Sequence, residues 1–257
     1  NKLNIIFATS NGSVRRNALT DFVKIQSNGK IAMKLSDDDR LIGVHTCVEK
    51  EDDVFLSTRE GKCLRFPITD VRKFSGRNSV GVRGIRLSKE DNVISMYILK
   101  HAKFSTDDRD KYLKIANSIR RKEQRRSTPY SKLSKGTNLD EEKFLEMEKL
   151  EEFILSVADN GYGKRSSAYE YRITRRGGKG IANMSVSKKT GKVVSSFPVN
   201  EKDDVMLIAG SGKLIRSPVN KIRIAGRTTQ GVTLFKVEKG EKVLSAASIK
   251  DLNISPE

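Results

Sequence analysis

The sequence predicts an all-β, propeller-like protein of about four four-stranded blades, interrupted by one helical insertion. Three observations lead to this fold class. A frame of about fifty residues recurs four times along the 257-residue chain, each copy opens with a short apolar run, and apolar and polar residues then alternate. Alternation with a period of two marks strands, and four strands per repeat of this length are typical of a propeller blade.

The repeat frame is built on two glycines and an arginine. An arginine stands four residues after the first glycine, and a second glycine follows 17 to 20 residues after the first. The first glycines and their arginines are Gly12 and Arg16, Gly61 and Arg65, Gly161 and Arg165, and Gly212 and Arg216. The second glycines are Gly29, Gly81, Gly180 and Gly231. Apolar residues follow each second glycine at four and six positions, so the match extends well beyond the glycines.

Each of the four units is expected to form one blade of a single domain spanning 1–257. The opening strands are the apolar runs at 5–9, 54–58, 153–158 and 205–209. The blade boundaries expected from the period are about 3–52, 53–102, 152–203 and 204–252. Acidic turns before two of the opening runs mark the joins between blades.

The segment 103–151, in or after the second blade, is expected to be a helical insertion because the period-two pattern stops there. Ser105 and Thr106 can cap a first helix whose first turn is acidic. A second helix is expected from Asn138 or Asp140. The apolar positions at helical spacing are Tyr112, Ile115 and Ile119 in the first helix and Phe144, Met147 and Leu150 in the second. We expect a two-helix hairpin joined by opposite charges; a partly disordered arm is the alternative.

The net charge limits the class of partner. Fifty Lys and Arg against 32 Asp and Glu give +18, which favours nucleic acid or an anionic membrane surface. The apolar runs are too short to span a bilayer, and the first residues lack the pattern of a secretory signal. Cys47 and Cys63 have no metal-ligand or redox spacing, which favours a reduced, cytoplasmic protein.

Cationic glycine loops recur at one place in the repeat. The stretch TRRGGKG at 174–180 corresponds to 76–81 and 226–231 in the neighbouring units. Glycine permits positive φ and close backbone approach, while arginine forks suit phosphate oxygens. The alternative is a solvated turn whose cations serve solubility. Recurrence of the cation and the overall charge favour nucleic acid.

These stretches resemble the C-terminal domain of the DNA gyrase A protein. TRRGGKG is similar to the family's heptad box, whose usual form is QRRGGKG. Further similar stretches are FATSNGSVRRNALTDF (7–22), GRNSVGVRGIRL (76–87), NGYGKRSSAYEY (160–171) and AGRTTQGV (225–232). The resemblance covers nearly the whole chain outside the insertion. It implies a β-pinwheel, a propeller relative in which neighbouring blades exchange a strand, and a basic rim around which duplex DNA bends.

The resemblance also implies a place in a larger enzyme. The parent would be a type II topoisomerase that introduces negative supercoils with ATP hydrolysis. Double-stranded DNA, the N-terminal region of gyrase A and the gyrase B protein in an A2B2 assembly are the implied partners, with no membrane. No cofactor is expected in this chain, because ATP and Mg²⁺ belong on gyrase B. The implied location is the bacterial cytoplasm, at the nucleoid. Topoisomerase IV carries a related domain and is the nearest alternative.

The candidate DNA contacts come from the loops and from the repeated arginines. The first group is the box itself: Arg175, Arg176, Gly177, Gly178, Lys179 and Gly180. The second group holds the rim candidates Arg77, Arg83, Arg227, Arg72, Lys73 and Arg223. The repeated arginines Arg16, Arg65, Arg165 and Arg216 have two roles open: facing DNA, or bracing the turn by pairing with acids such as Asp21 or Glu170.

The chain departs from the family pattern in three ways. Thr174 stands where glutamine is usual, and the box falls in the third unit, whereas the family's principal box belongs to its first blade. Gyrase pinwheels usually have six blades, so the chain is expected to begin partway through the domain. The helical insertion is not a general feature of the family.

No catalytic or metal site can be argued from the residues. The sequence Gly210–Lys213 is similar to a phosphate-binding loop, but Leu214 stands where serine or threonine is required. The acidic run 37–39 fits a polar turn better than a magnesium site, and His45 lies on an alternating run. The remaining alternative to DNA binding is a propeller-like scaffold whose charge serves solubility or an acidic protein partner.

Overall fold

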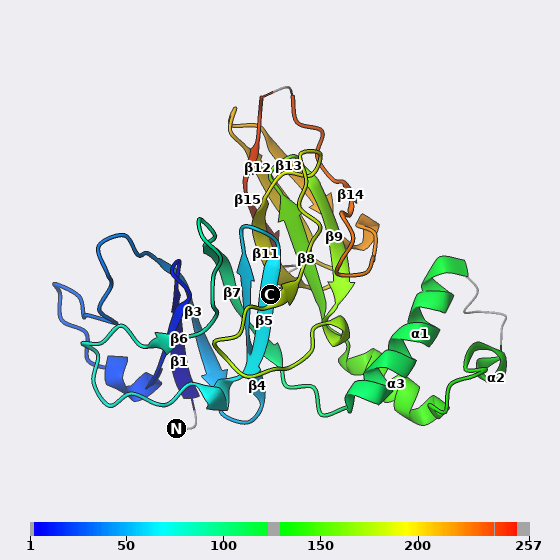
Figure 1. The fold of residues 1–257 in the computed structure, drawn as a ribbon, viewed down its shortest axis with the longest axis horizontal. Coiled ribbons are helices and arrows are strands. Elements are labelled where there is room, and N and C mark those ends of the chain that lie inside the picture. The colour runs from blue at the N-terminus through cyan, green and yellow to red at the C-terminus, as the bar shows by residue number, and fades with distance from the viewer. Residues whose placement is uncertain (1–2, 123–128, 239, 251–257) are drawn as a thin grey trace, which may run out of the picture.

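Four antiparallel sheets form the body of the protein in the computed structural model, which describes residues 3–122, 129–238 and 240–250. The sheets follow one another in chain order, with the innermost strands β3, β7, β11 and β15 in contact with their neighbours (Figure 1). Sheet one contains β3 (Leu41–Val48), β1 (Leu3–Thr9), β2 (Ser13–Ala18) and β6 (Val82–Arg83). Sheet two contains β10 (Ile181–Ala182), β5 (Lys62–Pro67), β4 (Asp52–Thr58) and β7 (Val93–Lys100).

The third and fourth sheets differ in strand number. Sheet three contains β11 (Val193–Val199), β8 (Phe153–Ala158), β9 (Tyr162–Ser167) and β14 (Val232–Thr233). Sheet four contains β13 (Leu214–Pro218), β12 (Asp204–Ala209) and β15 (Val243–Ile249). The prediction of an all-β pinwheel is confirmed, but the prediction of four strands in every blade is wrong for the fourth blade.

Strand exchange explains the missing strand. The short outer strand of each four-stranded sheet comes from the following unit: β6 pairs with β2, β10 with β5 and β14 with β9. Within the described residues no unit follows the fourth one, so β13 is an edge strand. The strand exchange implied by the resemblance is therefore present at all three joints, a joint being the contact between one unit and the next.

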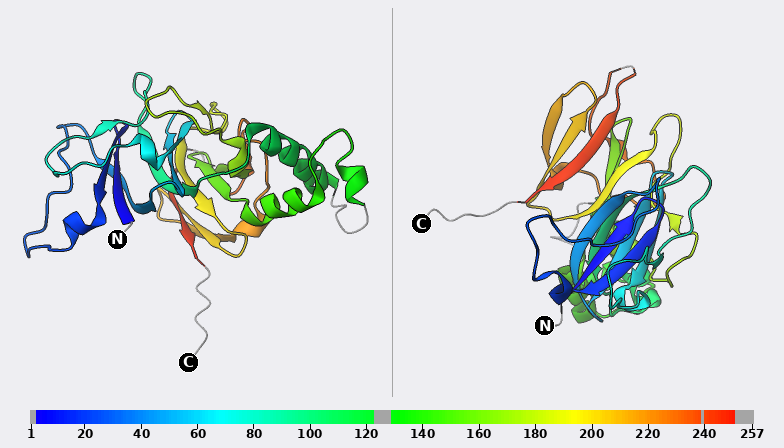
Figure 2. Two further views of the ribbon diagram at one scale, coloured as in Figure 1. Left: turned by 90° about the horizontal axis from the view of Figure 1, so that it is seen from below. Right: turned by 90° about the vertical axis from the view of Figure 1, so that its left-hand side faces the viewer.

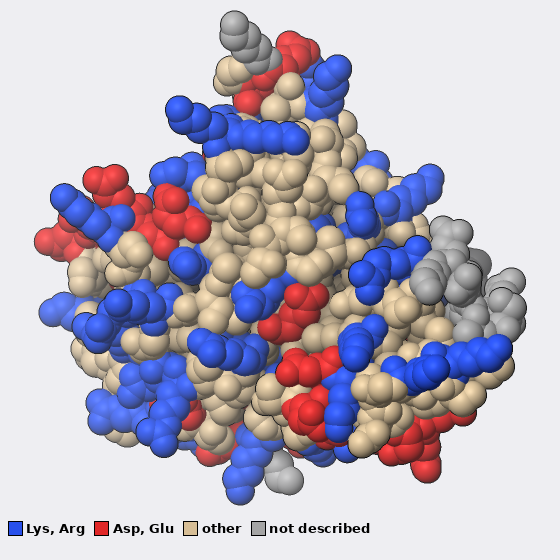
Figure 3. Space-filling model, turned by 45° about the vertical axis from the view of Figure 1, so that its right-hand side comes forward, with Lys and Arg blue, Asp and Glu red and all other residues tan. Residues whose placement is uncertain are grey.

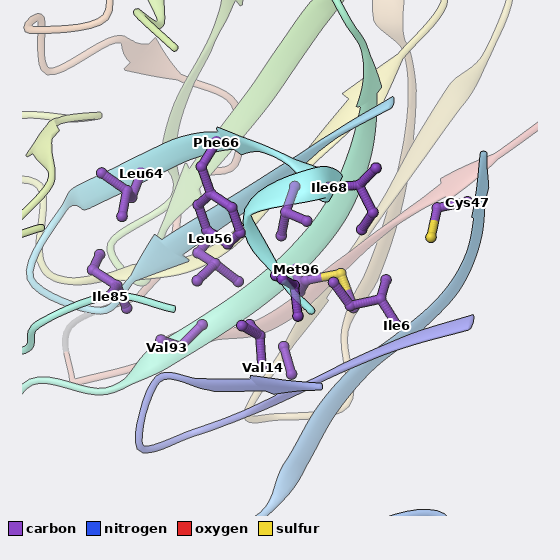
Figure 4. Packing of buried hydrophobic residues seen from close by; sticks show 13 residues of the cluster. Ile6, Val14, Cys47, Leu56, Leu64, Phe66, Ile68, Ile85, Val93 and Met96 are labelled. Carbon is purple, nitrogen blue, oxygen red and sulfur yellow. The ribbon is translucent and has the colours of Figure 1, made fainter. Parts of the chain in front are cut away.

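The core lies between neighbouring sheets. Alternating residues of β1, β2, β4, β5 and β7 bury apolar side chains between sheets one and two (Figure 4). Ile85, four residues after the second glycine of unit two, is 2% exposed in this cluster. The equivalent Met184 and Phe235 are buried at the next two joints. The apolar position four residues after the second glycine is thus a core position of the preceding joint in units two to four.

The insertion forms helices between β7 and β8 (Figures 1 and 2). These are α1 (Thr106–Lys122), α2 (Tyr130–Leu133) and α3 (Glu141–Leu150), so a one-turn helix accompanies the two expected ones. Ser105 Oγ accepts the Asp108 N–H at 3.1 Å, and Asp140 Oδ1 accepts the Lys143 N–H at 2.7 Å, as the capping argument predicts. None of the described helices has the length and apolar character of a bilayer-spanning helix.

The insertion packs on the third unit rather than projecting freely. Tyr112, Phe144 and Met147 are buried with Tyr169, whose hydroxyl donates to the Met147 carbonyl at 2.9 Å. Opposite charges join α1 to α3 at one end, where Lys143 Nζ lies 2.9 Å from Asp108 Oδ2. The predicted apolar stripe ends early, because Leu150 is 55% exposed. The described helices are thus tied to the short 3-10 helix Ala168–Glu170 (η3).

Candidate nucleic-acid interface

Three loops run along the outer edges of the sheets. They follow η2 (Ile68–Asp70), η3 and η4 (Val219–Lys221) and lead to the exchanged strands, and we call 71–81, 171–180 and 222–231 the rim loops. Each is anchored to the preceding unit in the same way. The repeated arginine accepts a backbone N–H through its own carbonyl: Arg16 from Phe74 at 2.8 Å, Arg65 from Thr174 at 2.9 Å, and Arg165 from Ala225 at 2.8 Å.

The second glycines are required by this anchoring. Gly81, Gly180 and Gly231 have φ between 73° and 85°. A Cβ on Gly180 would lie 2.5 Å from the Cys63 carbonyl oxygen, and the other two have equally close backbone neighbours. Such contacts leave no room for a side chain. The close approach that the glycines permit is therefore made to the protein's own preceding strand.

The repeated arginines of the first three units are buried braces. Arg65 is 2% exposed, and its guanidinium donates to Asp53 Oδ2 at 2.8 Å and to the Ala168 carbonyl at 2.9 Å. Arg16 and Arg165, both 4% exposed, donate through Nε to the carbonyls of Val71 and Ile222 at 2.7 Å. These carbonyl acceptors belong to the following unit at each joint. Of the two roles left open, bracing fits the geometry, and the prediction that Arg16, Arg65 and Arg165 face DNA is wrong.

The acids that pair with these braces differ from the expected ones. Arg16 lies 3.4 Å from Glu49 and Arg165 lies 3.3 Å from Glu201, in place of Asp21 and Glu170. Arg216 is the exception, because its side chain is 64% exposed and contacts Asp204 Oδ2 at 2.6 Å. No unit sits on sheet four within the described residues, so this arginine has no joint to brace. Its role toward DNA stays a prediction.

The arginines four residues before the second glycines shape the rim loops. Arg176 donates to the Asp70 and Arg83 carbonyls at 2.8 and 3.0 Å. Arg227 donates to the Glu170 and Ala182 carbonyls at 3.2 and 2.6 Å. Both side chains are half-buried, and they fasten their loop to the preceding 3-10 helix and the exchanged strands. Arg77 is also half-buried and donates to the Ile31 carbonyl at 2.7 Å.

The remaining predicted cations are exposed on the outer edge. The exposed members are Arg72, Lys73, Arg83, Arg175, Lys179 and Arg223, together with the box residue Gly178. Among the described residues none of these cations forms a salt bridge. Gly177 and Gly180 are half-buried. The structure thus brings Arg83 and the box loop together, since Gly177 N–H donates to the Gly84 carbonyl at 2.5 Å.

Two rows of cations emerge once the repeat is combined with the structure. The first cation row is the eleventh residue after the first glycine: Arg72, Arg172 and Arg223. The second cation row is the fifth residue after the second glycine: Lys34, Arg86 and Lys236. All six are exposed. Arg172 and the whole second row were missed by sequence reasoning, although the repeat frame contained the signal.

The second cation row lies beside the rim loops. The Arg86 N–H donates to the Gly178 carbonyl at 2.8 Å, and the Lys34 N–H donates to the Ser79 carbonyl at 3.3 Å. Each of these two residues is thereby held next to the loop of the following unit. Figure 3 shows Lys and Arg spread over one face of the molecule, with Asp and Glu in smaller groups. The exposed cations of the two rows therefore give the outer edge positive charge, which attracts phosphates.

The described residues contain few groups suited to other chemistry. No group of three or more His, Cys, Asp and Glu that could hold a metal ion occurs in the part of the chain that the structure describes. Both cysteines are buried and free. Burial raises the pKa of Cys47 and Cys63 to about 12, so neither thiol is available as a thiolate near neutrality.

Exchanged outer strands, arginine-braced joints and a basic outer edge define the class of strand-exchanged, propeller-like repeat proteins. The chain belongs to the family described as the DNA gyrase C-terminal domain, beta-propeller. The family model matches 3–47, 52–100, 152–200 and 203–250, and it omits the insertion.

Known relatives and structures agree with this family. The DNA gyrase A protein of Rickettsia bellii is 51% identical over 249 residues, which are 97% of this chain and 27% of that protein. A solved DNA gyrase A C-terminal domain superposes with a TM-score of 0.68 at 21% identity, covering 97% of this chain and 66% of the other. A topoisomerase IV C-terminal domain gives 0.72 at 17% identity, covering 97% and 62%. The chain thus spans about a quarter of the Rickettsia relative, and the structural likeness concerns the fold.

Proposed function

We propose that this chain is a DNA-binding and DNA-bending domain of a DNA gyrase A protein. The observation that carries the proposal is the pair of exposed cation rows along the outer edge, each with a cation in three of the four units. Two further exposed cations of unit two show the spacing across this edge: Lys73, next to Arg72 of the first cation row, lies beside Arg16, and Arg83 lies beside Ser13, three residues earlier on β2. That separation is ~10 Å along a strand, so cations at two heights can contact phosphates on both sides of one groove.

Repetition of weak contacts suits bending. Bending a site of 20–30 base pairs costs on the order of 1–6 kcal/mol, and each unit adds a few phosphate contacts that offset this cost. The described outer edge presents arginine and lysine on loops and short strands rather than a helix that could enter the major groove. Sequence preference should therefore come from DNA deformability, as in other proteins that wrap DNA through backbone contacts.

The remaining functions are proposed for the longer protein. We propose that it acts in a type II topoisomerase that introduces negative supercoils, with ATP and Mg²⁺ used on gyrase B. The N-terminal region of gyrase A and the gyrase B protein are the proposed protein partners. The cytoplasm, at the nucleoid, is the proposed location. The name of the Rickettsia bellii relative, a DNA gyrase A protein, supports this assignment.

DNA binding is tested by its salt dependence. The double variant Arg175→Ala/Lys179→Ala should lower the slope of log K against log salt by about 0.9 per lost phosphate contact, hence by up to about 1.8. The matched control is Lys135→Ala/Lys149→Ala, which removes the same charge from exposed positions of the insertion. Equal slopes for both double variants would mean that net charge, and not the rim, governs binding.

A topology assay separates bending from wrapping. Relaxed plasmid is mixed with the chain, a relaxing topoisomerase is added, and the linking number is read on a gel. A positive linking change supports a chiral wrap of the gyrase type. Salt-sensitive binding without a linking change favours a domain of the topoisomerase IV type. The C-terminal domain of topoisomerase IV has a fold similar to that of this chain. Absence of binding would leave the scaffold alternative.

A further inference from the structure

Lys164 is a fully buried lysine beneath a rim loop. It lies on β9, three residues after the first glycine of unit three, and is 0% exposed. Its Nζ donates to the Gly226 carbonyl at 2.7 Å, the Asn183 carbonyl at 3.0 Å and Ser166 Oγ at 3.2 Å. Gly226 immediately precedes Arg227 in the rim loop 222–231. The amine therefore holds the loop at the point where its arginine begins.

Unit one has a cation at the same repeat position. Arg15 is 1% exposed and donates to the Ser79 carbonyl at 2.6 Å and to the Gly76 carbonyl. Gly76 precedes the rim-loop arginine Arg77 as Gly226 precedes Arg227. Two different side chains thus bring buried positive charge to the carbonyl at the same position of the repeat, that of Gly76 in one joint and of Gly226 in the other. Burial of a charge is costly unless it is well hydrogen-bonded, so its recurrence at one position indicates a use for it.

Unit two supplies a natural comparison. Leu64 occupies the equivalent position, and a Cβ built on Gly178 would lie 3.7 Å from its side chain. The box loop above Leu64 is held by the Arg176 side chain and by backbone hydrogen bonds, with Gly177 N–H donating to Gly84 and Gly178 accepting from Arg86. A leucine is therefore compatible with the β-strand at this position, while the loop above it needs other fastenings.

We propose that Lys164 is a positioning residue for DNA contact, which fixes rim loop 222–231 so that Arg223 faces the nucleic acid. The inference rests on the proposed function. The lysine itself does not touch DNA, because it is enclosed by sheet three, the exchanged segment containing Asn183 and the rim loop. Its contribution is the loop geometry, together with positive charge beneath the outer edge.

The protonation state of Lys164 should be visible in DNA binding. Burial lowers its pKa to about 7, while Glu170 of η3 opposes the shift. The other groups that face it are Cys63 of β5 and Arg227 of the rim loop. Burial raises the pKa of Cys63 to about 12, so this thiol keeps its proton near neutrality. Loss of the proton relieves the cost of burying the charge, but it removes positive charge from beneath the outer edge, so the attraction for phosphates weakens as pH rises.

The test is DNA affinity measured by fluorescence anisotropy with a labelled duplex, at constant ionic strength, across the pH range that brackets this pKa. The chain itself should bind about three- to tenfold more weakly at the alkaline end, the size expected when one positive charge is lost about 10 Å from phosphates. Lys164→Arg/Ser166→Asn copies Arg15 and Asn17 of unit one, keeps its charge and should show a flat profile. Lys164→Leu copies Leu64 and should bind weakly at every pH.

Each outcome decides the inference. A profile that falls equally in the chain and in Lys164→Arg/Ser166→Asn would overturn it, because the double variant keeps its charge at position 164. Undiminished binding by folded Lys164→Leu would overturn it as well. If Lys164→Leu fails to fold by circular dichroism, the two pH profiles decide alone. Absence of DNA binding by the unaltered chain would instead overturn the proposed function.

Discussion

The three filled joints and the open edge of sheet four contain the same motif in different surroundings. Gly161 and Arg165 are covered by the following unit, whereas Gly212 and Arg216 are exposed on the edge beside β13. A Cβ on Gly161 would meet the Phe235 carbonyl at 1.9 Å, while a Cβ on Gly212 would meet nothing within 4 Å. The motif therefore forms the contact surface for the next unit, and its contribution to stability depends on whether that unit packs against it.

The largest difference in the loss of stability is expected between alanine variants of Arg65 and Arg216. Arg65→Ala removes the guanidinium partner of Asp53, which is 0% exposed, and leaves a buried carboxylate. Loss of one partner of a buried pair costs about 3–5 kcal/mol, and the lower end applies because His101 Nδ1 stays 2.7 Å from Asp53. Arg216→Ala should cost less than about 1 kcal/mol, since exposed pairs are weak. Urea unfolding followed by circular dichroism measures the free energy of unfolding of both variants. Similar losses of stability would refute the interpretation that the motif stabilises the protein through the following unit.

The first glycines should show the next largest difference. Gly161 has φ of 79° and Gly212 has φ of 84°, so alanine is strained at both positions by about 1–2 kcal/mol. Only Gly161→Ala adds a backbone clash, which raises its expected cost to about 3 kcal/mol or more. The difference between the two variants in free energy of unfolding gives the contribution of contact with the following unit. Equal destabilisation would show that backbone conformation alone explains the repeated glycine.

A smaller effect follows from the buried cation of the third joint. The pKa of Lys164 is lowered to about 7, so between that pH and about 10.4 the unfolded chain binds more protons than the folded one. Stability therefore rises with pH across this window, by up to about 1.4 kcal/mol per pH unit, and is lowest below it. Lys164→Met should flatten this part of the curve. An unchanged slope in urea titrations at several pH values would contradict the assignment.

Much of the fold could be predicted from the sequence because each pattern occurs in all four repeats. The opening runs, the glycine pairs and the insertion all lie where the period puts them. The exchanged strands could not be predicted from local pattern, since β6, β10 and β14 are two residues each and pair only with a neighbouring unit. Alternation over two residues carries no information.

The candidate site was harder to predict than the fold. Arg165 and Arg216 have the same spacing from glycine, yet one is 4% exposed and the other has a side chain that is 64% exposed. Burial here depends on a unit some fifty residues further along the chain, which no short motif reveals. Arg172 was missed for the opposite reason: its equivalence to Arg72 and Arg223 is visible in the repeat, but it lies just outside the box.

The smallest stability effect, and the sharpest separation of DNA contact from joint, is expected within unit three itself. Arg172 is exposed, whereas Arg165, seven residues earlier, is a buried brace. Arg172→Ala should change the free energy of unfolding by less than about 0.5 kcal/mol and lower the salt slope of DNA binding by about 0.9. Arg165→Ala should instead lower the stability, with binding lost only where the joint opens. Paired unfolding and anisotropy measurements distinguish the two, and a salt slope unchanged by Arg172→Ala would remove the first cation row from the interface.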